Sequence, residues 1–217
     1  ELARAMAEAP RPSPASNVPA KVSVSRLDGG LPGGEAVFHV PAFISDAAES
    51  AAARGSATHA LLAALPLAAQ TEADVRRALG ALVSRGAVEP EQAEAVDVPS
   101  IARFATSPLY TRLRGAPRVE RELPFTRRVS AAEFYPGAIG ETVLLQGVID
   151  CCFLEDGHWI LLDYKTDRIP PGVSPAAHAQ KHARQLALYA DALLALTGTP
   201  VAERYAVLLA CGEAARV

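Results

Sequence analysis

Residues 159–167 read WILLDYKTD and residues 146–153 read QGVIDCCF, and these two stretches decide the fold. Both are apolar runs of strand length, and each carries one carboxylate, Asp163 and Asp150. The segment between them contains EDGH, and an Asp-Gly dipeptide is a strong signal for a tight turn. The pattern therefore predicts the two strands of an antiparallel hairpin.

This hairpin carries ionisable side chains in places where charge is costly. Because residues i and i+2 of a strand share one face, Asp163 and Lys165 are expected to project together, while Tyr164 points away. Asp150 is a second carboxylate in an equally apolar strand, and buried charges tend to be ion-paired or bound to metal.

Two chemical readings of these residues remain open. Carboxylates from Asp150 and Asp163, with the backbone carbonyl of Tyr164, suit Mg²⁺ or Mn²⁺. The ammonium of Lys165 suits the positioning of an attacking water or the stabilisation of charge on a phosphate. An ordinary salt bridge at a strand end accounts for the Asp-Tyr-Lys triplet equally well.

Helical patterns dominate the chain before the hairpin. The alanine-rich stretch at residues 45–65 favours a helix. Thr71 and Asp74 form a capping-box-like start for a second helix that runs to about Arg85. A third helix is expected over residues 90–106, where Pro99 can interrupt it.

Strand and helix patterns complete the chain. A strand interrupted by Pro124 is expected over residues 119–129. Residues 176–197 suit a helix that Gly198 ends, and residues 204–211 suit a final apolar strand. Together these elements predict a mixed α/β fold, in which a helical N-terminal portion packs against a central mixed sheet flanked by helices.

The start of the chain has the composition of a linker. Residues 9–20 contain four prolines among serines and alanines, which favours extended chain over packed structure. We interpret residues 1–20 as a linker from an upstream domain and residues 21–217 as one domain. Because the first residue is Glu1, we expect a fragment of a longer protein.

Composition narrows the classes of protein. No apolar run approaches the roughly 18 to 20 residues that cross a bilayer, so a soluble domain is expected. The three cysteines, adjacent Cys151 and Cys152 and distant Cys211, form neither a disulfide framework nor a metal-binding CxxC pattern. Their number and spacing favour the reducing cytoplasm.

Charge is unevenly distributed along the chain. The whole chain carries −3, but residues 103–128 hold seven arginines against two glutamates, a local charge of +5 that leaves −8 elsewhere. Such a stripe suits phosphate binding, while an acidic centre elsewhere suits metal. A solvated arginine-rich face explains the same pattern.

Three motifs occur in a fixed order along the second half of the chain: GxxD ending at Asp150, DYKT starting at Asp163, and QLxxY from Gln185 to Tyr189. This series resembles the RecB-type nuclease domains of the PD-(D/E)xK class. Within that group it is most similar to the AddA-type domains at the C-terminus of bacterial AddAB helicase-nucleases. GSATH at residues 55–59 resembles the early GxxxH motif of the family, and RELPF at residues 121–125 resembles its RE-x-PF strand.

The resemblance, which spans about residues 20–212, implies roles for particular residues and a restriction-endonuclease-like core. His59, Asp150 and Asp163 are expected to bind the metal with the carbonyl of Tyr164, and Lys165 is expected to act on the water or phosphate. Three further residues are expected to support the site or contact DNA: Glu122, Gln185 and Tyr189. Without the motif series, His59 would be an ordinary helix residue and Glu122 a surface ion-pair partner.

The resemblance also implies an activity. We expect Mg²⁺-dependent hydrolysis of DNA phosphodiester bonds by an exonuclease, with Mn²⁺ as a substitute ion and single-stranded DNA as the substrate. Helicase domains upstream in the same chain would deliver the DNA during double-strand-break repair, with an AddB-like second subunit. The alternatives are a catalytically silent DNA-binding or scaffold module of the same fold and a stand-alone CRISPR-associated exonuclease.

Two other metal chemistries fit the sequence poorly. His178 and His182 have the spacing of a zinc-protease motif, but Ala179 stands where the catalytic glutamate should be. An iron-sulfur cluster needs more cysteines at closer spacing than the three present.

Overall fold

The computed structural model describes residues 18–24 and 42–217, with the side chains of residues 42–51 left out. The expected linker at residues 1–20 lies almost wholly outside the described residues. None of the helices within the described part of the chain is long and apolar enough to span a bilayer.

The chain forms two compact units: residues 1–33 with 124–147, and residues 34–123 with 148–217. Within the smaller unit, β1 (Lys21–Ser23) pairs in parallel with the first part of β3 (Thr142–Glu155). A backbone hydrogen bond of 2.9 Å from Ala131 to Glu141 closes the connection that leads from β2 (Val119–Ser130) into β3. Between these strands lies the short helix η3 (Ala131–Glu133).

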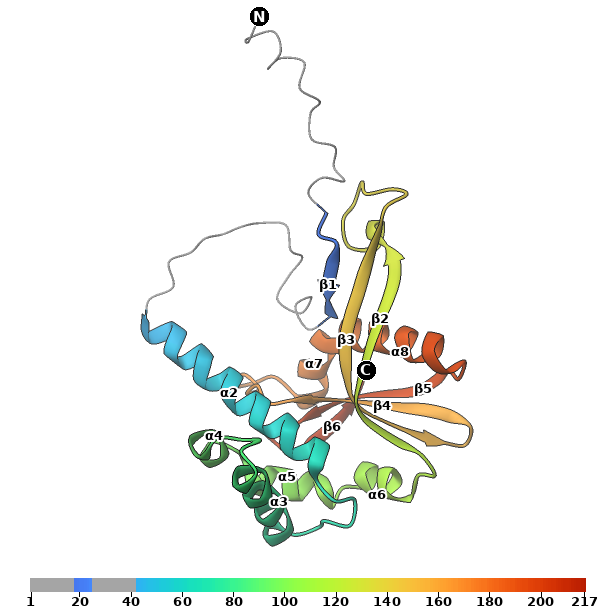
Figure 1. Ribbon diagram of the computed structural model, residues 1–217. Helices are drawn as coiled ribbons and strands as arrows, with labels where there is room; N and C mark the ends of the chain where they lie inside the picture. The colour runs from blue at the N-terminus through green and yellow to red at the C-terminus, as the bar shows by residue number, and fades with distance from the viewer. Residues whose placement is uncertain (1–17, 25–41) are drawn as a thin grey trace, which may run out of the picture. The chain divides into compact units, whose positions relative to one another are not determined.

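The larger unit contains the predicted hairpin and the rest of the sheet (Figure 1). β3 pairs antiparallel with β4 (His158–Lys165), and β4 pairs in parallel with β5 (Val201–Leu208). β5 in turn pairs antiparallel with β6 (Glu213–Arg216). Both the hairpin and the mixed sheet are therefore confirmed.

Helices surround this sheet. Five precede the hairpin and three short or longer segments follow β4: α2 (Ala42–Ala64), α3 (Glu72–Ser84), α4 (Pro90–Glu94), α5 (Val98–Ala105), α6 (Pro108–Gly115), α7 (Pro175–Ala179), η4 (Gln180–His182) and α8 (Ala183–Thr197). The helical character of the first half is confirmed for the described residues. α6, β1 and β6 have no counterpart in the sequence prediction.

Local chemistry fixes several helix ends. The Thr71 hydroxyl accepts the Asp74 N–H at 3.2 Å, while the Asp74 carboxylate accepts the Thr71 N–H at 3.1 Å, which confirms the capping box. Gly198 ends α8 in the left-handed conformation at φ 70°, as expected.

Three element boundaries differ from the sequence prediction. The helix expected over residues 90–106 breaks before Pro99, because Asp97 caps α5 and proline fits its first turn. The 176–197 helix is interrupted by η4. The strand expected at residues 204–211 starts at Val201 and ends at Leu208, where the chain turns into β6.

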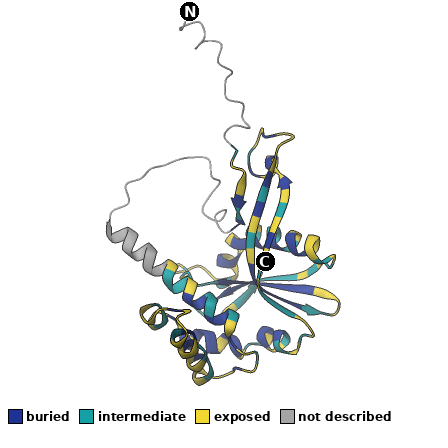
Figure 2. Cartoon of the chain, viewed as in Figure 1, coloured by how far each residue is buried: buried dark blue, intermediate teal, exposed yellow. Residues whose placement is uncertain are grey.

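The core of the larger unit lies between the sheet and helices α2, α3, α5 and α6. Figure 2 shows β4 and the adjoining part of β3 as almost wholly buried. Tyr164 belongs to this core, with its ring 5.9 Å from that of Phe104 in an edge-on arrangement. The expectation that Tyr164 faces away from Asp163 and Lys165 is thereby confirmed.

Arginines of the basic stripe stabilise the fold. Arg112 pairs with Glu155 and, at 2.8 Å, with Glu203, which connects α6 to the ends of β3 and β5. Arg121 donates to the carbonyl oxygens of Ala63 and Leu65 at 3.0 and 2.6 Å, and so satisfies the C-terminal end of α2. These two arginines are therefore committed to protein partners, which favours the structural reading of the stripe over phosphate binding.

Candidate active site

Asp163 and Lys165 lie at the end of β4 and meet there. The Lys165 ammonium is 2.8 Å from Oδ2 of Asp163, and the Asp163 side chain is only 3% exposed. Apart from this ammonium, that oxygen has no hydrogen-bond partner among the described residues. The shared face predicted from the i, i+2 spacing is confirmed, but a salt bridge alone leaves a buried carboxylate incompletely satisfied.

Asp150 occupies the corresponding position on β3. The antiparallel ladder reaches Cys151 opposite Leu162, so Asp150 and Asp163 are the next residues on each strand. Beyond the ladder, the Tyr164 N–H donates to Oδ2 of Asp150 at 2.7 Å. The carboxylate thus satisfies a backbone group that the ladder no longer pairs, and this bond fixes its position beside Asp163.

α8 supports Lys165 from the other side. The Gln185 side-chain oxygen accepts from the Lys165 ammonium at 2.6 Å, and the Gln185 amide donates to the Tyr189 hydroxyl at 3.0 Å. Gln185 and Tyr189 are each 3% exposed and one helical turn apart. Lys165 is therefore held between a carboxylate and an oriented amide, which fixes where its positive charge lies.

α2 brings His59 to the same end of the sheet. Its Nδ1 is 3.3 Å from Oδ1 of Asp150, and its Nε2 is 3.1 Å from the backbone oxygen of Tyr164. Gly55, one turn earlier, lies against the end of β4, since an added Cβ would be 3.6 Å from the Thr166 hydroxyl. The GxxxH pattern thus places its small residue against the strand and its imidazole at the carboxylates.

Glu122 comes from β2 with an unusual backbone. Its φ of 49° lies in the left-handed region, which is uncommon for a residue with a side chain. His59, Glu122 and Asp150 each offer a ligand atom, and these atoms lie within 4.8 Å of one another. The geometry gives Glu122 a place among possible metal ligands, whereas the family motif had suggested only support of the site or DNA contact.

The carboxylates affect one another's ionisation. Burial, together with the charge of Asp150, raises the pKa of Asp163 to about 7, although Lys165 acts in the opposite direction. Burial lowers the pKa of His59, but its hydrogen bond to Asp150 and the nearby acids outweigh this, so the pKa of His59 lies above 6.5. Glu122 shows the same crowding, because burial and the Asp150 charge raise its pKa.

This donor set fits a divalent cation. The buried carboxylates of Asp150 and Asp163 and the carbonyl of Tyr164 offer hard oxygen ligands, and His59 adds an imidazole nitrogen. A cation of charge +2 would relieve the repulsion that raises the pKa of Asp163. The site therefore has both the ligands and the charge deficit that such an ion requires.

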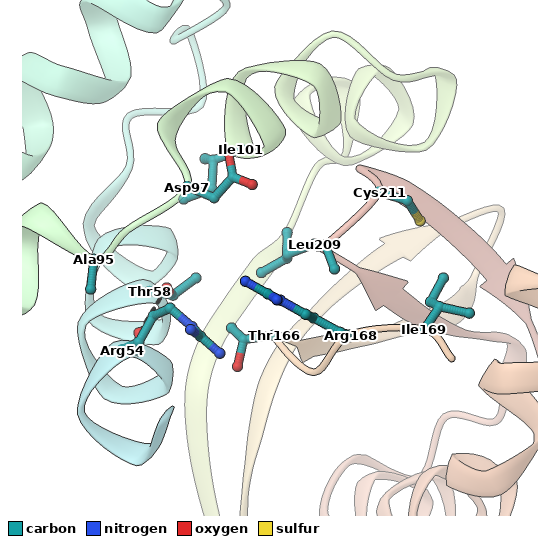
Figure 3. Close-up of a pocket in the computed structure, with 11 residues that line it drawn as sticks. Arg54, Thr58, Ala95, Asp97, Ile101, Thr166, Arg168, Ile169, Leu209 and Cys211 are labelled. Atoms are coloured by element: carbon teal, nitrogen blue, oxygen red, sulfur yellow. Dashed lines mark hydrogen bonds between the residues drawn. The ribbon is translucent and has the colours of Figure 1, made fainter. Parts of the chain in front are cut away.

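A pocket of about 580 Å³ adjoins the site (Figure 3). Thr58 and Thr166, the chain neighbours of His59 and Lys165, line it, and Arg54 and Arg168 extend their guanidinium groups into it. Sequence reasoning missed both arginines, because they lie 114 residues apart and outside the basic stripe of residues 103–128. Only the fold brings them together beside the carboxylates.

The mixed sheet and its site define the class of the restriction-endonuclease-like nucleases. A sequence profile described as the PD-(D/E)XK nuclease superfamily matches residues 35–214, so the chain belongs to that superfamily. It is a nuclease domain, and nucleases of this superfamily generally use divalent metal ions.

Individual relatives carry one name, that of the AddA subunit of the ATP-dependent helicase/nuclease. The chain is 42% identical over 171 residues to this protein from Heliobacterium modesticaldum, covering 76% of this chain and 12% of that protein. It is 41% identical over 167 residues to the protein of that name from Pelotomaculum thermopropionicum, covering 75% and 13%. For Geobacillus kaustophilus the identity is 37% over 181 residues, with 78% and 14% covered. The chain thus spans about an eighth of the length of these relatives.

Proposed function

We propose that this chain is the nuclease domain of an AddA-type helicase-nuclease and hydrolyses single-stranded DNA with Mg²⁺. The observation that carries the proposal is the position of Lys165, whose ammonium lies between the Asp163 carboxylate and the Gln185 amide oxygen. Next to it, Asp150 and His59 present further ligand atoms at the same end of the sheet. Helicase domains in the same chain, an AddB-like partner, double-strand-break repair and a cytoplasmic location belong to this proposal.

The proposed roles follow from the contacts. Asp150 and Asp163 hold the metal with the Tyr164 carbonyl, while His59 and Glu122 complete the ligand set. When bound, the metal supplies a Lewis acid that activates water and neutralises charge on the phosphate. Lys165 places positive charge beside the attacking water, and Gln185, oriented by Tyr189, keeps its ammonium in place.

The decisive test is cleavage of end-labelled single-stranded DNA by the 217-residue chain. We expect cleavage with Mg²⁺ or Mn²⁺ and none in excess EDTA, because the buried carboxylates need the cation to act on a phosphodiester. A matched duplex should be cut more slowly. Cleavage that persists in EDTA would contradict the metal requirement, and equal cleavage of duplex would contradict the substrate preference.

The same assay separates the two alternatives. A silent DNA-binding module would bind the oligonucleotide and leave it intact under every metal condition. The intact Asp150, Asp163 and Lys165 constellation argues against that outcome. A stand-alone CRISPR-associated exonuclease would share the chemistry but lack upstream helicase domains, so the length of the full gene product distinguishes it.

We expect the arginine-lined pocket to hold a backbone phosphate of the DNA. Arg54→Ala and Arg168→Ala should each weaken binding of single-stranded DNA in EDTA. Each should also reduce the slope of log affinity against log salt by roughly 0.7 to 1, the value for one lost phosphate contact. Fluorescence anisotropy of a labelled oligonucleotide measures both.

Arg118→Ala is the matched control for these pocket variants. Arg118 is 58% exposed and pairs with Glu120 at 2.8 Å, and it does not line the pocket. Its salt slope should equal that of the native chain. A slope lowered as much in Arg118→Ala as in Arg168→Ala would make the pocket no more than part of a general positive surface.

A further inference from the structure

Asp167, His178 and His182 form a second cluster of metal-ligating side chains. Asp167 follows β4, His178 lies in α7, and His182 ends η4. One ligand atom from each lies within 4.8 Å of the other two. Neither the proposed metal centre at Asp150 and Asp163 nor the arginine-lined pocket includes any of these residues.

The cluster is largely enclosed. His178 and His182 are 7% and 5% exposed, and their rings face each other edge-on with centroids 6.2 Å apart. Nε2 of His178 is 2.7 Å from Oδ2 of Asp167. The four-residue spacing places both imidazoles on one side of the chain as it passes from α7 through η4, and Asp167 faces them from the loop after β4.

We propose that these three residues bind a transition-metal ion of the Zn²⁺ type. Imidazole nitrogens favour Zn²⁺ and related ions, whereas Mg²⁺ prefers oxygen ligands, so the site differs in chemistry from the nuclease centre. Two histidines and one carboxylate are a common zinc ligand set that leaves a coordination position for water. The absence of a catalytic glutamate after His178, which excludes a zinc protease, leaves this metal-binding geometry intact.

One neighbouring cation competes with the proposed ion. Lys181 forms an ion pair with the same Oδ2 of Asp167 that His178 contacts. Its side chain is 47% exposed, so it can turn into solvent when a metal takes the carboxylate. The ion pair therefore weakens metal binding without preventing it.

The position of the site gives the ion a structural consequence. It connects the loop that starts two residues after Lys165 to the segment that leads directly into α8. Gln185, three residues after His182, holds the Lys165 ammonium. A bound ion would fix the start of α8 against the end of β4 and so steady this contact, independently of whether the proposed DNA substrate is correct.

The test is Zn²⁺ titration of the whole chain in a His59→Gln/Asp150→Asn background, which disables the nuclease centre. We expect one equivalent of Zn²⁺ to bind, and the affinity to fall more than about tenfold in His178→Gln and in Asp167→Asn, since each removes a ligand. Lys181→Met should bind Zn²⁺ more tightly, because it keeps all three ligands and removes the competing charge. Co²⁺ in place of Zn²⁺ should give a visible absorption band from the same stoichiometric complex.

His158→Gln is the control, because His158 is an exposed histidine in the hairpin turn, hydrogen-bonded to the Asp156 carbonyl. Its Zn²⁺ affinity should match that of the background. X-ray absorption should report two imidazole nitrogens at about 2.0 to 2.1 Å from zinc. No Zn²⁺ binding in the background chain, or equal binding after His178→Gln with no gain in Lys181→Met, would overturn the site and leave an ordinary ion-pair network.

Discussion

Asp163→Asn should lower the rate of single-stranded DNA cleavage by on the order of a thousandfold at saturating Mg²⁺. The substitution keeps the shape of the side chain but removes the charge of the most deeply buried carboxylate in the site. Loss of a few kcal/mol of metal-dependent stabilisation corresponds to about three powers of ten in rate. Single-turnover cleavage of a labelled oligonucleotide measures the effect.

Thermal unfolding separates this catalytic loss from a loss of folding. Because burial and Asp150 raise the pKa of Asp163, its ionised form is disfavoured in the folded, metal-free chain relative to the unfolded chain. That penalty is present above the raised pKa and disappears as the pH falls below it. At pH above about 7, metal-free Asp163→Asn should therefore melt at no lower temperature than the native chain.

The matched control is Asp156→Asn in the turn of the same hairpin. Asp156 is exposed and has a φ of 48°, a conformation that asparagine tolerates well. It should cleave DNA at the native rate. Equal rates for Asp163→Asn and Asp156→Asn would remove Asp163 from the active site.

Lys165→Met should lower cleavage by roughly a hundred- to a thousandfold while leaving metal binding intact. Methionine retains much of the apolar stem but removes the ammonium that Asp163 and Gln185 hold. Because Lys165 is a cation beside a metal ligand, its removal should maintain or increase the affinity for Mn²⁺. Calorimetry with Mn²⁺ and the cleavage assay together give both readouts.

Lys21→Met serves as the control for the lysine substitution, since Lys21 is an exposed residue of β1. It should change neither cleavage nor Mn²⁺ affinity. If Lys165→Met lost Mn²⁺ binding as completely as cleavage, its effect would be on the assembly of the site. The proposed role of the ammonium in the reaction would then fail.

Much of the fold follows from local patterns. The apolar strands around EDGH, the capping box at Thr71 and the glycine that ends α8 each depend on neighbouring residues, and all three are confirmed. The short β1 and β6 were missed because three or four residues carry too little periodicity to define a strand. They become strands only through pairing with β3 and β5.

The candidate site divides in the same way. The i, i+2 spacing placed Asp163 and Lys165 together, and the motif series singled out Gln185, which the structure brings to the Lys165 ammonium. His59 was singled out by the family motif alone, since nothing in an alanine-rich helix indicates contact with a residue 91 positions later. The contact of His59 with Asp150 and the Tyr164 carbonyl is tertiary.

By itself, the sequence determined the hairpin, the face that Asp163 shares with Lys165, and the order of the nuclease motifs, because strand geometry and turn chemistry act over a few residues. Tertiary structure decided the rest. It assigned arginines of the basic stripe to protein carboxylates and carbonyls, placed Arg54 beside Arg168, and brought Asp167 to His178 and His182. Those choices depend on which distant surfaces pack together, and one-dimensional charge patterns do not encode that information.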